Sequence, residues 1–435
     1  MKQSAKEIFL VGVASVLPDK LIRSQIKLTG DKLQVQHYTY DLNTFKNIFV
    51  IGAGKASALM ASAIESILGN RITSGHIITK YDHGVELKHI KLSEAGHPVP
   101  DQNGLHATSA IIKIAHQAEK DDLVICLISG GASALLIDTP PGIPLEDIVV
   151  VNEILLKSGA DIREVNIIRK HLSKVKGGQL AKVVFPATIL SLILSDVVGD
   201  PMDVIASGPT VPDTSSFMDV TGIIKKYELE KRLPQSIIKH IVRGAAGIVT
   251  ENPKPDDLCF INTNNIIIGS NQTALEAASN EAVEKKFDTH IITNSLQGDY
   301  LQVANFILKT IEQYVRQQGK QPVCLLFGGE PTVQVRGNGL GGRNQHLALY
   351  LATKIKGKRD ITIVCAGTDG TDGPTDVAGA VVDNYTISKA LSLDIDPHLY
   401  LENADSYAFF NQVGGHIKIG STQTNVMDLV ITLMY

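Results

Sequence analysis

Two glycine-rich turns, each followed by one cation, are the residues of this sequence best suited to phosphate chemistry. In the first turn, Gly54 precedes Lys55 directly after a short β-branched run. In the second, four glycines between positions 337 and 342 lead into Arg343 and an apolar pattern of helical spacing. Glycine lets the backbone approach a ligand, helix N-termini attract anions, and a guanidinium binds phosphate or carboxylate as a planar fork. Both turns are candidate phosphate sites; the alternative is a tight turn with a solvated cation.

A third loop carries neutral donors. Ser129, Gly130, Gly131 and Ser133 follow a buried apolar run, and their small side chains leave N–H and hydroxyl groups uncovered. Such donors suit a carboxylate or a phosphate, so we expect substrate binding here. The alternatives are a turn that needs glycine for steric reasons and a nucleophilic serine. The GxSxG pattern of a nucleophile elbow is absent, and no His lies nearby in the sequence.

Carboxylates follow two further buried runs. Asp196 and Asp200 lie in one loop after residues 187–194, and Asp369 begins an Asp/Gly-rich loop after residues 361–365. Mg²⁺ prefers one or two carboxylates, with water and substrate phosphate oxygens completing its shell. We therefore predict that these three aspartates bind Mg²⁺ or contact a substrate hydroxyl. The alternative is a series of Asx turns.

The remaining composition excludes several function classes. Lys and Arg number 41 against 45 Asp and Glu, a net charge of −4, and there is no Trp, so nucleic-acid binding is not expected. The N-terminal apolar stretch is too short to span a membrane and is not a convincing signal peptide. The four cysteines are far apart, and three lie in apolar runs, which indicates reduced buried thiols and a cytoplasmic location.

The elements that must position these loops are strands alternating with helices, which predicts α/β domains with mostly parallel sheets. In such sheets ligands bind beyond the carboxyl ends of the strands, where the candidate loops lie. A stretch of Gly, Pro and Asp without periodicity at 244–257 predicts a boundary between an N-terminal Rossmann-like domain, 1–245, and a C-terminal domain, 258–435. Around Arg343 we predict a strand, a turn at 328–331, a second strand at 332–335, the glycine loop and a helix.

Seven segments taken together resemble the class II glycerate kinases, a family with a C-terminal domain called MOFRL. The resemblance covers residues 45 to 382 and continues weakly to the end. The segments are IGAGKASALMA (51–61), EAGHPVPD (94–101), LISGGASALL (127–136), NIIRKHLSKVKGGQLA (166–181), LSDVVGDPMDVIASGPTVPD (194–213), GGEPTVQVRGNGLGGRNQHLAL (328–349) and AGTDGTDGPTDVAGA (366–380).

The resemblance implies two α/β domains with the active site in the cleft between them. It also implies ATP-dependent phosphorylation of D-glycerate at the 2-hydroxyl, giving 2-phospho-D-glycerate and ADP, in a monomer or homodimer. The family's catalytic Lys and Arg match Lys55 and Arg343. One departure is visible: Ser421 and Gln423 stand where the family usually has Pro and Gly.

Roles for the other residues follow from phosphoryl transfer, which depends mostly on positioning and charge neutralisation. Asp196 is expected to orient the 2-hydroxyl or accept its proton, besides its share in Mg²⁺ binding. Gly54, Glu330 and Asn344 join the Ser129–Ser133 loop as expected phosphate or substrate contacts.

Two rival functions need different residues. An NAD(P)H-dependent hydroxypyruvate reductase needs the GxGxxG fingerprint, but GAGKAS lacks the third glycine, and Lys55 occupies the pyrophosphate turn. A non-enzymatic sugar-acid binding protein would need the same cleft without carboxylates placed for Mg²⁺.

Overall fold

The computed structural model describes residues 1–317, 321–357 and 360–435, which form two compact units. The first unit consists of Leu21–Leu194 and Pro201–Ile268, and the second of Met1–Lys20, Ser195–Asp200 and Gly269–Tyr435. These ranges differ from the predicted 1–245 and 258–435. The N-terminal helix belongs to the second unit, and a strand at 263–269 lies in the sheet of the first.

The first unit is built on a six-stranded sheet in the order β6-β5-β4-β7-β8-β9. Its strands are β4 (Asn47–Ala53), β5 (Ser74–Lys80), β6 (Lys91–Ala95), β7 (Asp122–Ile128), β8 (Thr188–Leu194) and β9 (Thr263–Gly269). Strands β4 to β8 pair in parallel, and every residue of β7 is buried, as expected for a strand covered on both faces. The parallel α/β arrangement predicted from the alternation is confirmed for this unit.

The strand order places the first two candidate loops side by side. The chain runs from β4 outward to β5 and β6, then returns to the other side of β4 as β7. The two strands are in register, with Ala53 opposite Ile128, so the loops that follow them begin at the same level. This is the switch point where open α/β sheets bind ligands, and Lys55 and Ser129 lie directly beyond it.

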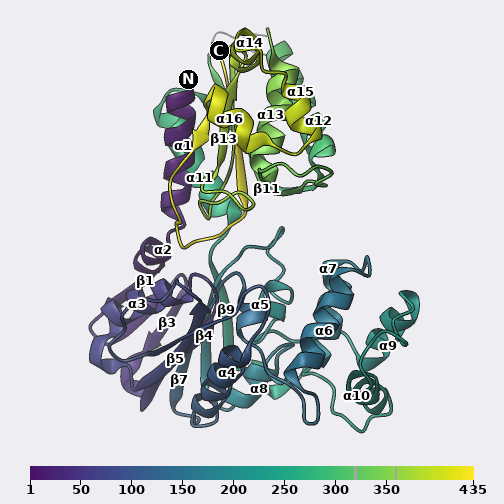
Figure 1. Ribbon diagram of the computed structural model, residues 1–435. Helices are drawn as coiled ribbons and strands as arrows, with labels where there is room; N and C mark the ends of the chain where they lie inside the picture. The colour runs from purple at the N-terminus through teal and green to yellow at the C-terminus, as the bar shows by residue number, and fades with distance from the viewer. Residues whose placement is uncertain (318–320, 358–359) are drawn as a thin grey trace. The chain divides into compact units, whose positions relative to one another are not determined.

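Helices and a small sheet complete the first unit. The helices are α3 (Ser57–Leu68), α4 (Gln102–Ala115), α5 (Ala132–Leu135), α6 (Leu145–Leu156), α7 (Ile162–His171), α8 (Gln179–Val184), α9 (Phe217–Lys226) and α10 (Gln235–Ala245). Helices α6, α7, α9 and α10 pack together around their own apolar core (Figure 1). The small antiparallel sheet comprises β1 (Ile26–Thr29), β2 (Lys32–Val35) and β3 (Tyr38–Asp41), and α2 (Pro18–Gln25) precedes it.

The second unit has a mixed sheet in the order β10-β11-β15-β12-β13-β14. Its strands are β10 (Asp288–Asp299), β11 (Val323–Thr332), β12 (Ile361–Gly367), β13 (Gly379–Asp383), β14 (His416–Ile417) and β15 (Asp428–Met434). Among the described strands of this sheet, only β10 and β11 pair in parallel. Strand β15 enters between β11 and β12 and runs antiparallel to both, and β13 runs antiparallel to β12 and β14. This sheet therefore departs from the mostly parallel pairing expected, although its layers are those of an α/β unit.

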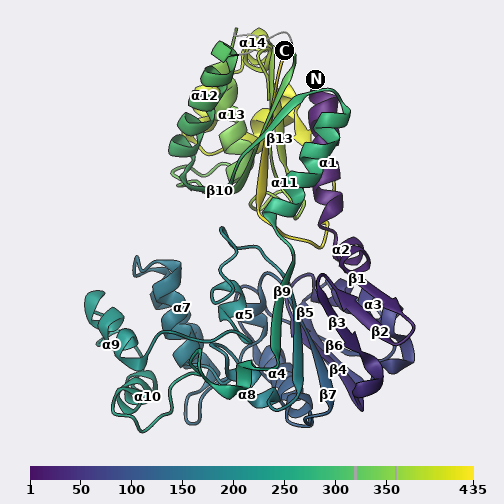
Figure 2. The ribbon, with the colours of Figure 1, turned by 180° about the vertical axis from the view of Figure 1, so that it is seen from behind.

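Helices cover both faces of the second sheet. They are α1 (Lys2–Ser15), α11 (Asn271–Glu284), α12 (Tyr300–Gln317), α13 (Arg343–Ile355), α14 (Thr386–Ser392), α15 (Pro397–Glu402) and α16 (Ser406–Val413). Helices α1 and α11 lie side by side on one face, with α12 and α13 on the other, in both views (Figure 1) (Figure 2). Among the described residues, none of the helices combines the length and the apolar character needed to span a bilayer.

The predicted hairpin at 328–335 is wrong. Strand β11 continues through Gly328 and Gly329 to Thr332, and residues 333–342 contain no strand. The glycines serve close packing instead of a turn. A Cβ atom on Gly328 would lie 1.7 Å from Oδ1 of Asn271, and one on Gly329 would lie 2.3 Å from the Leu296 carbonyl oxygen.

We expect Gly328→Ala to lower the free energy of unfolding by at least about 2 kcal/mol, since Asn271 has no room to move aside. Its Nδ2 already donates to the carbonyl oxygens of Val426 and Asp428, at 2.8 and 3.0 Å. Urea unfolding measures the change. The matched control is Gly222→Ala, at an exposed position of α9 with nothing within 4 Å of an added Cβ, which should raise the free energy of unfolding by about 0.5–1 kcal/mol. Equal stabilities of the two variants would contradict the packing argument.

Candidate active site

The turns after β4 and β7 interlock in the first unit. The Lys55 backbone N–H donates to the Gly130 carbonyl oxygen at 2.9 Å, and the Ser129 hydroxyl accepts from the Ala56 N–H at 3.0 Å. A Cβ on Gly54 would lie 2.1 Å from Oγ of Ser129, so only glycine fits there. Ser129 is 1% exposed and holds the two turns together. The substrate contacts predicted for Ser129 and Gly54 stay predictions. A substrate that bound the Ser129 hydroxyl would compete with its hydrogen bond to the Ala56 N–H.

Gly131 lies between Lys55 and a histidine that sequence reasoning did not include among the site residues. Its φ is +85°, and a Cβ there would approach His97 Nε2 to 3.0 Å and Lys55 Cγ to 3.3 Å. Burial, and then the charges of Lys55 and other cations, lower the pKa of His97 to about 4. The imidazole is therefore neutral at neutral pH. The signal that could have identified His97 is its position two residues after β6, in the same row of strand ends.

A cavity of about 280 Å³ opens beside this turn. Gly131, Ser133 and His97 line one part of it, and the cations Arg169 and Lys176 line another. Lys176 is 2% exposed, and its ammonium donates to the Leu136 carbonyl oxygen at 2.7 Å. In the described part of the chain, no carboxylate lies within 4.0 Å of the Arg169 or Lys176 charge, which leaves both cations available to an anionic ligand.

Burial, opposed by the charge of Asp138 and aided by that of Arg169, lowers the pKa of Lys176 from 10.5 to about 8. Because the unfolded chain holds this proton more tightly, raising the pH from 8 towards 10.5 favours the folded state. We expect the free energy of unfolding of the wild type to rise relative to that of Lys176→Met between about pH 7.5 and about pH 9.5, measured in urea. Parallel pH dependences would contradict a shifted Lys176.

A strained turn lies behind Ser133, one of the residues that line the cavity. Ala206, Ser207 and Gly208 all have left-handed backbone angles, with φ of 55°, 58° and 60°. The Ser207 hydroxyl donates to Oδ1 of Asn166 at 3.0 Å and lies 3.2 Å from the Ser133 hydroxyl. Left-handed angles at non-glycine residues each cost about 1–3 kcal/mol and concentrate at functional sites. The turn therefore marks Ser133 as a precisely positioned group.

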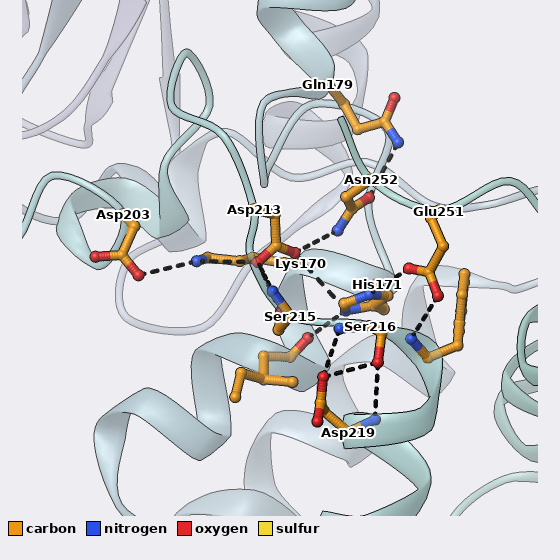
Figure 3. Close-up of polar contacts among 12 residues, drawn as sticks. Lys170, His171, Gln179, Asp203, Asp213, Ser215, Ser216, Asp219, Glu251 and Asn252 are labelled. Carbon is orange, nitrogen blue, oxygen red and sulfur yellow. Dashed lines mark hydrogen bonds and ion pairs between the residues drawn. The ribbon is translucent and has the colours of Figure 1, made fainter. Parts of the chain in front are cut away.

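A buried polar network fixes the turn that follows Lys176 (Figure 3). The Lys170 ammonium lies 3.5 Å from Asp213 and 3.3 Å from Asp203, and Asn252 donates to Asp213 at 2.8 Å. Gly177 packs against this group, since a Cβ there would lie 2.8 Å from Nδ2 of Asn252. Lys170 is thus buried and paired with carboxylates.

In the second unit Arg343 is held by two carboxylates. Its Nε and one terminal nitrogen contact Asp428 at 2.6 and 3.0 Å, and the other terminal nitrogen contacts Glu330 at 2.9 Å. Burial would lower the pKa of Arg343, but the charges of Asp428, Glu330 and Asp372 outweigh it and raise the pKa. The Arg343 side chain is 34% exposed, which leaves room for a ligand beside it. Asp428 was not among the predicted site residues.

The carboxylate of Asp372 already occupies the N-terminus of α13. Asp372 accepts from the backbone N–H groups of Asn344 and Gln345, at 3.0 and 2.8 Å. The Asn344 side chain is buried, with its amide 3.4 Å from the same carboxylate. The helix end expected to attract a substrate phosphate is therefore capped from within the chain, and contact between Asn344 and a substrate would require this cap to open.

The three predicted metal ligands all lie in segments that belong to the second unit. Asp196 and Asp200 lie in Ser195–Asp200, and Asp369 follows β12. All three are partly exposed, but the described residues include no cluster of three His, Cys, Asp or Glu side chains that could hold a metal. A metal here would need oxygen ligands from a substrate, as Mg²⁺ commonly takes them.

Comparison with known proteins gives a consistent result. Residues 4–242 match a family described as a domain of unknown function (DUF4147), and residues 323–428 match the MOFRL family. The glycerate 2-kinase of Pyrococcus horikoshii is 42% identical over 421 residues, 96% of this chain and 93% of the relative. The D-glycerate 2-kinase of Thermotoga maritima is 38% identical over 438 residues, 100% of this chain and 98% of the relative. A crystal structure of glycerate kinase from Thermotoga maritima matches with a TM-score of 0.88 at 38% identity, covering 100% of this chain and 99% of that one.

Proposed function

The chain belongs to the glycerate kinase family that carries a MOFRL domain, and we propose that it transfers the terminal phosphoryl group of ATP to the 2-hydroxyl of D-glycerate. The observation that supports this most strongly is the position of Lys55. Its ammonium has no carboxylate partner among the described residues and stands at the switch point of a parallel sheet, beside two glycine turns. A cation in that place is suited to offset charge growing on a transferred phosphoryl group.

The first unit supplies donors without added negative charge. The turn at 129–133 offers backbone N–H groups and the Ser133 hydroxyl, and the neutral His97 can donate or accept a hydrogen bond without repelling Lys55. We propose that phosphate oxygens, or the carboxylate of glycerate, bind here. Positioning of this kind is most of what phosphoryl transfer requires of a protein.

The second unit supplies a preoriented guanidinium. Asp428 holds Arg343 from one side, and we propose that the open side binds the transferred group or the glycerate carboxylate. Glu330 would then have to exchange its contact with the incoming anion or turn towards the 2-hydroxyl. We propose Asp196 as the group that orients this hydroxyl or accepts its proton.

Mg²⁺ is proposed as the partner of ATP. The partly exposed carboxylates of Asp196, Asp200 and Asp369 have the right chemistry, and one or two of them would hold the ion together with phosphate oxygens. When bound, it would neutralise phosphate charge. We also propose a cytoplasmic, monomeric or homodimeric enzyme; all four cysteines are buried and unpaired, as predicted.

One assay separates this function from its rivals. The purified protein is incubated with ATP, Mg²⁺ and D-glycerate, ADP release is followed, and the product is analysed by phosphorus NMR. ADP and 2-phospho-D-glycerate are expected. Oxidation of NADH with hydroxypyruvate would instead indicate the reductase, and tight glycerate binding without either reaction would indicate a binding protein.

A further inference from the structure

We propose that the cavity between α5, α6 and α7 of the first unit binds the adenine base of ATP and directs its phosphates to the turn at 129–133. This inference rests on the proposed kinase function and adds the subsite for the base. The cavity, at about 280 Å³, is close to the lower limit of ligand pockets, roughly 300 Å³. A three-carbon hydroxy acid would leave most of it unfilled, and its walls are mainly apolar.

One face of α6 forms a wall of the cavity. Val149, Asn152, Glu153 and Leu156 line it at spacings of three and four residues, the spacing of one helix face. Leu156 is 74% exposed, so a large apolar side chain stands at the rim with little protein covering it. An apolar, planar ligand would bury this side chain against Val149, as apolar burial favours.

Asn152 and Glu153 offer the polar contacts that an adenine edge requires. The Asn152 side-chain oxygen accepts from Nε of Arg169 at 2.8 Å, which fixes the direction of its amide. In the part of the chain that the structure describes, Nδ2 of Asn152 has no hydrogen-bond partner and can donate to a ring nitrogen. The Glu153 carboxylate can accept from the exocyclic amine.

Two cations of the lining suit the phosphates, and one of them is Arg169, which also holds Asn152. Lys176 is a buried cation and Arg169 a partly exposed one, Asp138 lies near Lys176, and His97 and Glu153 are the remaining titratable groups of the lining. Gly131 joins the cavity to Lys55, whose Cγ would lie 3.3 Å from an added Cβ. A nucleotide with its base against α6 therefore has a continuous path of donors leading to Lys55.

The test places a large side chain on α6, where it fills the cavity. Val149→Trp should weaken the binding of ADP at least about tenfold in calorimetry without glycerate, because the indole occupies the space of the base. The matched control is Val150→Trp, one residue away, 42% exposed and outside the lining, which should bind ADP as the wild type does. Thermal unfolding checks that both variants fold.

A second variant keeps the inference testable if Val149→Trp does not fold. Leu156→Asp changes an exposed rim residue and should weaken ADP binding severalfold while inorganic triphosphate, which lacks the base, binds unchanged. ADP binding that is unaffected by both variants overturns the adenine site, whatever the kinase assay shows. Wild-type protein that binds ADP in this way but does not phosphorylate glycerate would refute the proposed function and leave the adenine site standing.

Discussion

Replacing Lys55 with alanine is expected to lower kcat for glycerate phosphorylation by about 10²–10³-fold, with the fold intact. The substitution removes the side chain beyond Cβ, and with it the ammonium, while the backbone N–H of the residue still donates to the Gly130 carbonyl oxygen. An oriented cation acts on charge that grows in the transition state, so kcat should fall more than the KM for either substrate rises.

The control for Lys55 is Lys46→Ala, just before the opposite end of β4. Lys46 is an exposed residue paired with Asp121 at 3.2 Å, and its loss should leave kcat within about twofold of the wild type. Lys55→Arg, which keeps the charge but changes its shape, should recover part of the activity. Turnover by Lys55→Ala close to that of the wild type would remove Lys55 from the chemistry.

Replacing Arg343 with lysine is expected to lower kcat/KM by about 10²-fold and also to destabilise the second unit. Lysine keeps the charge but cannot contact Asp428 through two nitrogens while also reaching Glu330. Asp428 is 2% exposed, so the loss of one donor to it costs about 1–3 kcal/mol of unfolding free energy. Steady-state kinetics and urea unfolding measure the two effects.

The matched control is Arg336→Lys, in the glycine-rich loop that precedes α13. Arg336 is exposed, and among the described residues its guanidinium hydrogen-bonds only to the Gln334 side chain. The Arg336→Lys substitution should therefore change neither the free energy of unfolding nor kcat/KM appreciably. If Arg343→Lys is destabilised but fully active, the guanidinium has a structural role only.

The features predicted correctly from the sequence are those that depend on local sequence patterns. Alternating strands and helices predicted the parallel sheet of the first unit, and with it the meeting of the Lys55 and Ser129 turns, because carboxyl ends of parallel strands share one edge. The signal for His97, its position two residues after β6, has meaning only once the order of the strands is known. His97 becomes part of the site only because β6 ends at the same edge as β4.

Sequence reasoning failed where contacts come from distant segments. The glycines in β11 were assigned to a turn because glycine is typical of turns, whereas Asn271 and Leu296 require them there. The anion at the α13 N-terminus proved to be Asp372, and the fixed partner of Arg343 proved to be Asp428, 85 residues away. Such contacts between residues far apart in the sequence depend on the order of the strands in a mixed sheet, and local sequence patterns do not predict that order.

The central place of β15 affects how the protein can fold during its synthesis. Residues 21–194 and 201–268 contain a whole sheet, so the first unit can fold once this part has left the ribosome. Helix α1 emerges before the rest of the second unit, yet its main packing partners begin at residue 271. Strands β11 and β12 have no strand between them until β15 has been made, so the nascent second unit exposes two unpaired strand edges until Asp428–Met434 has left the ribosome.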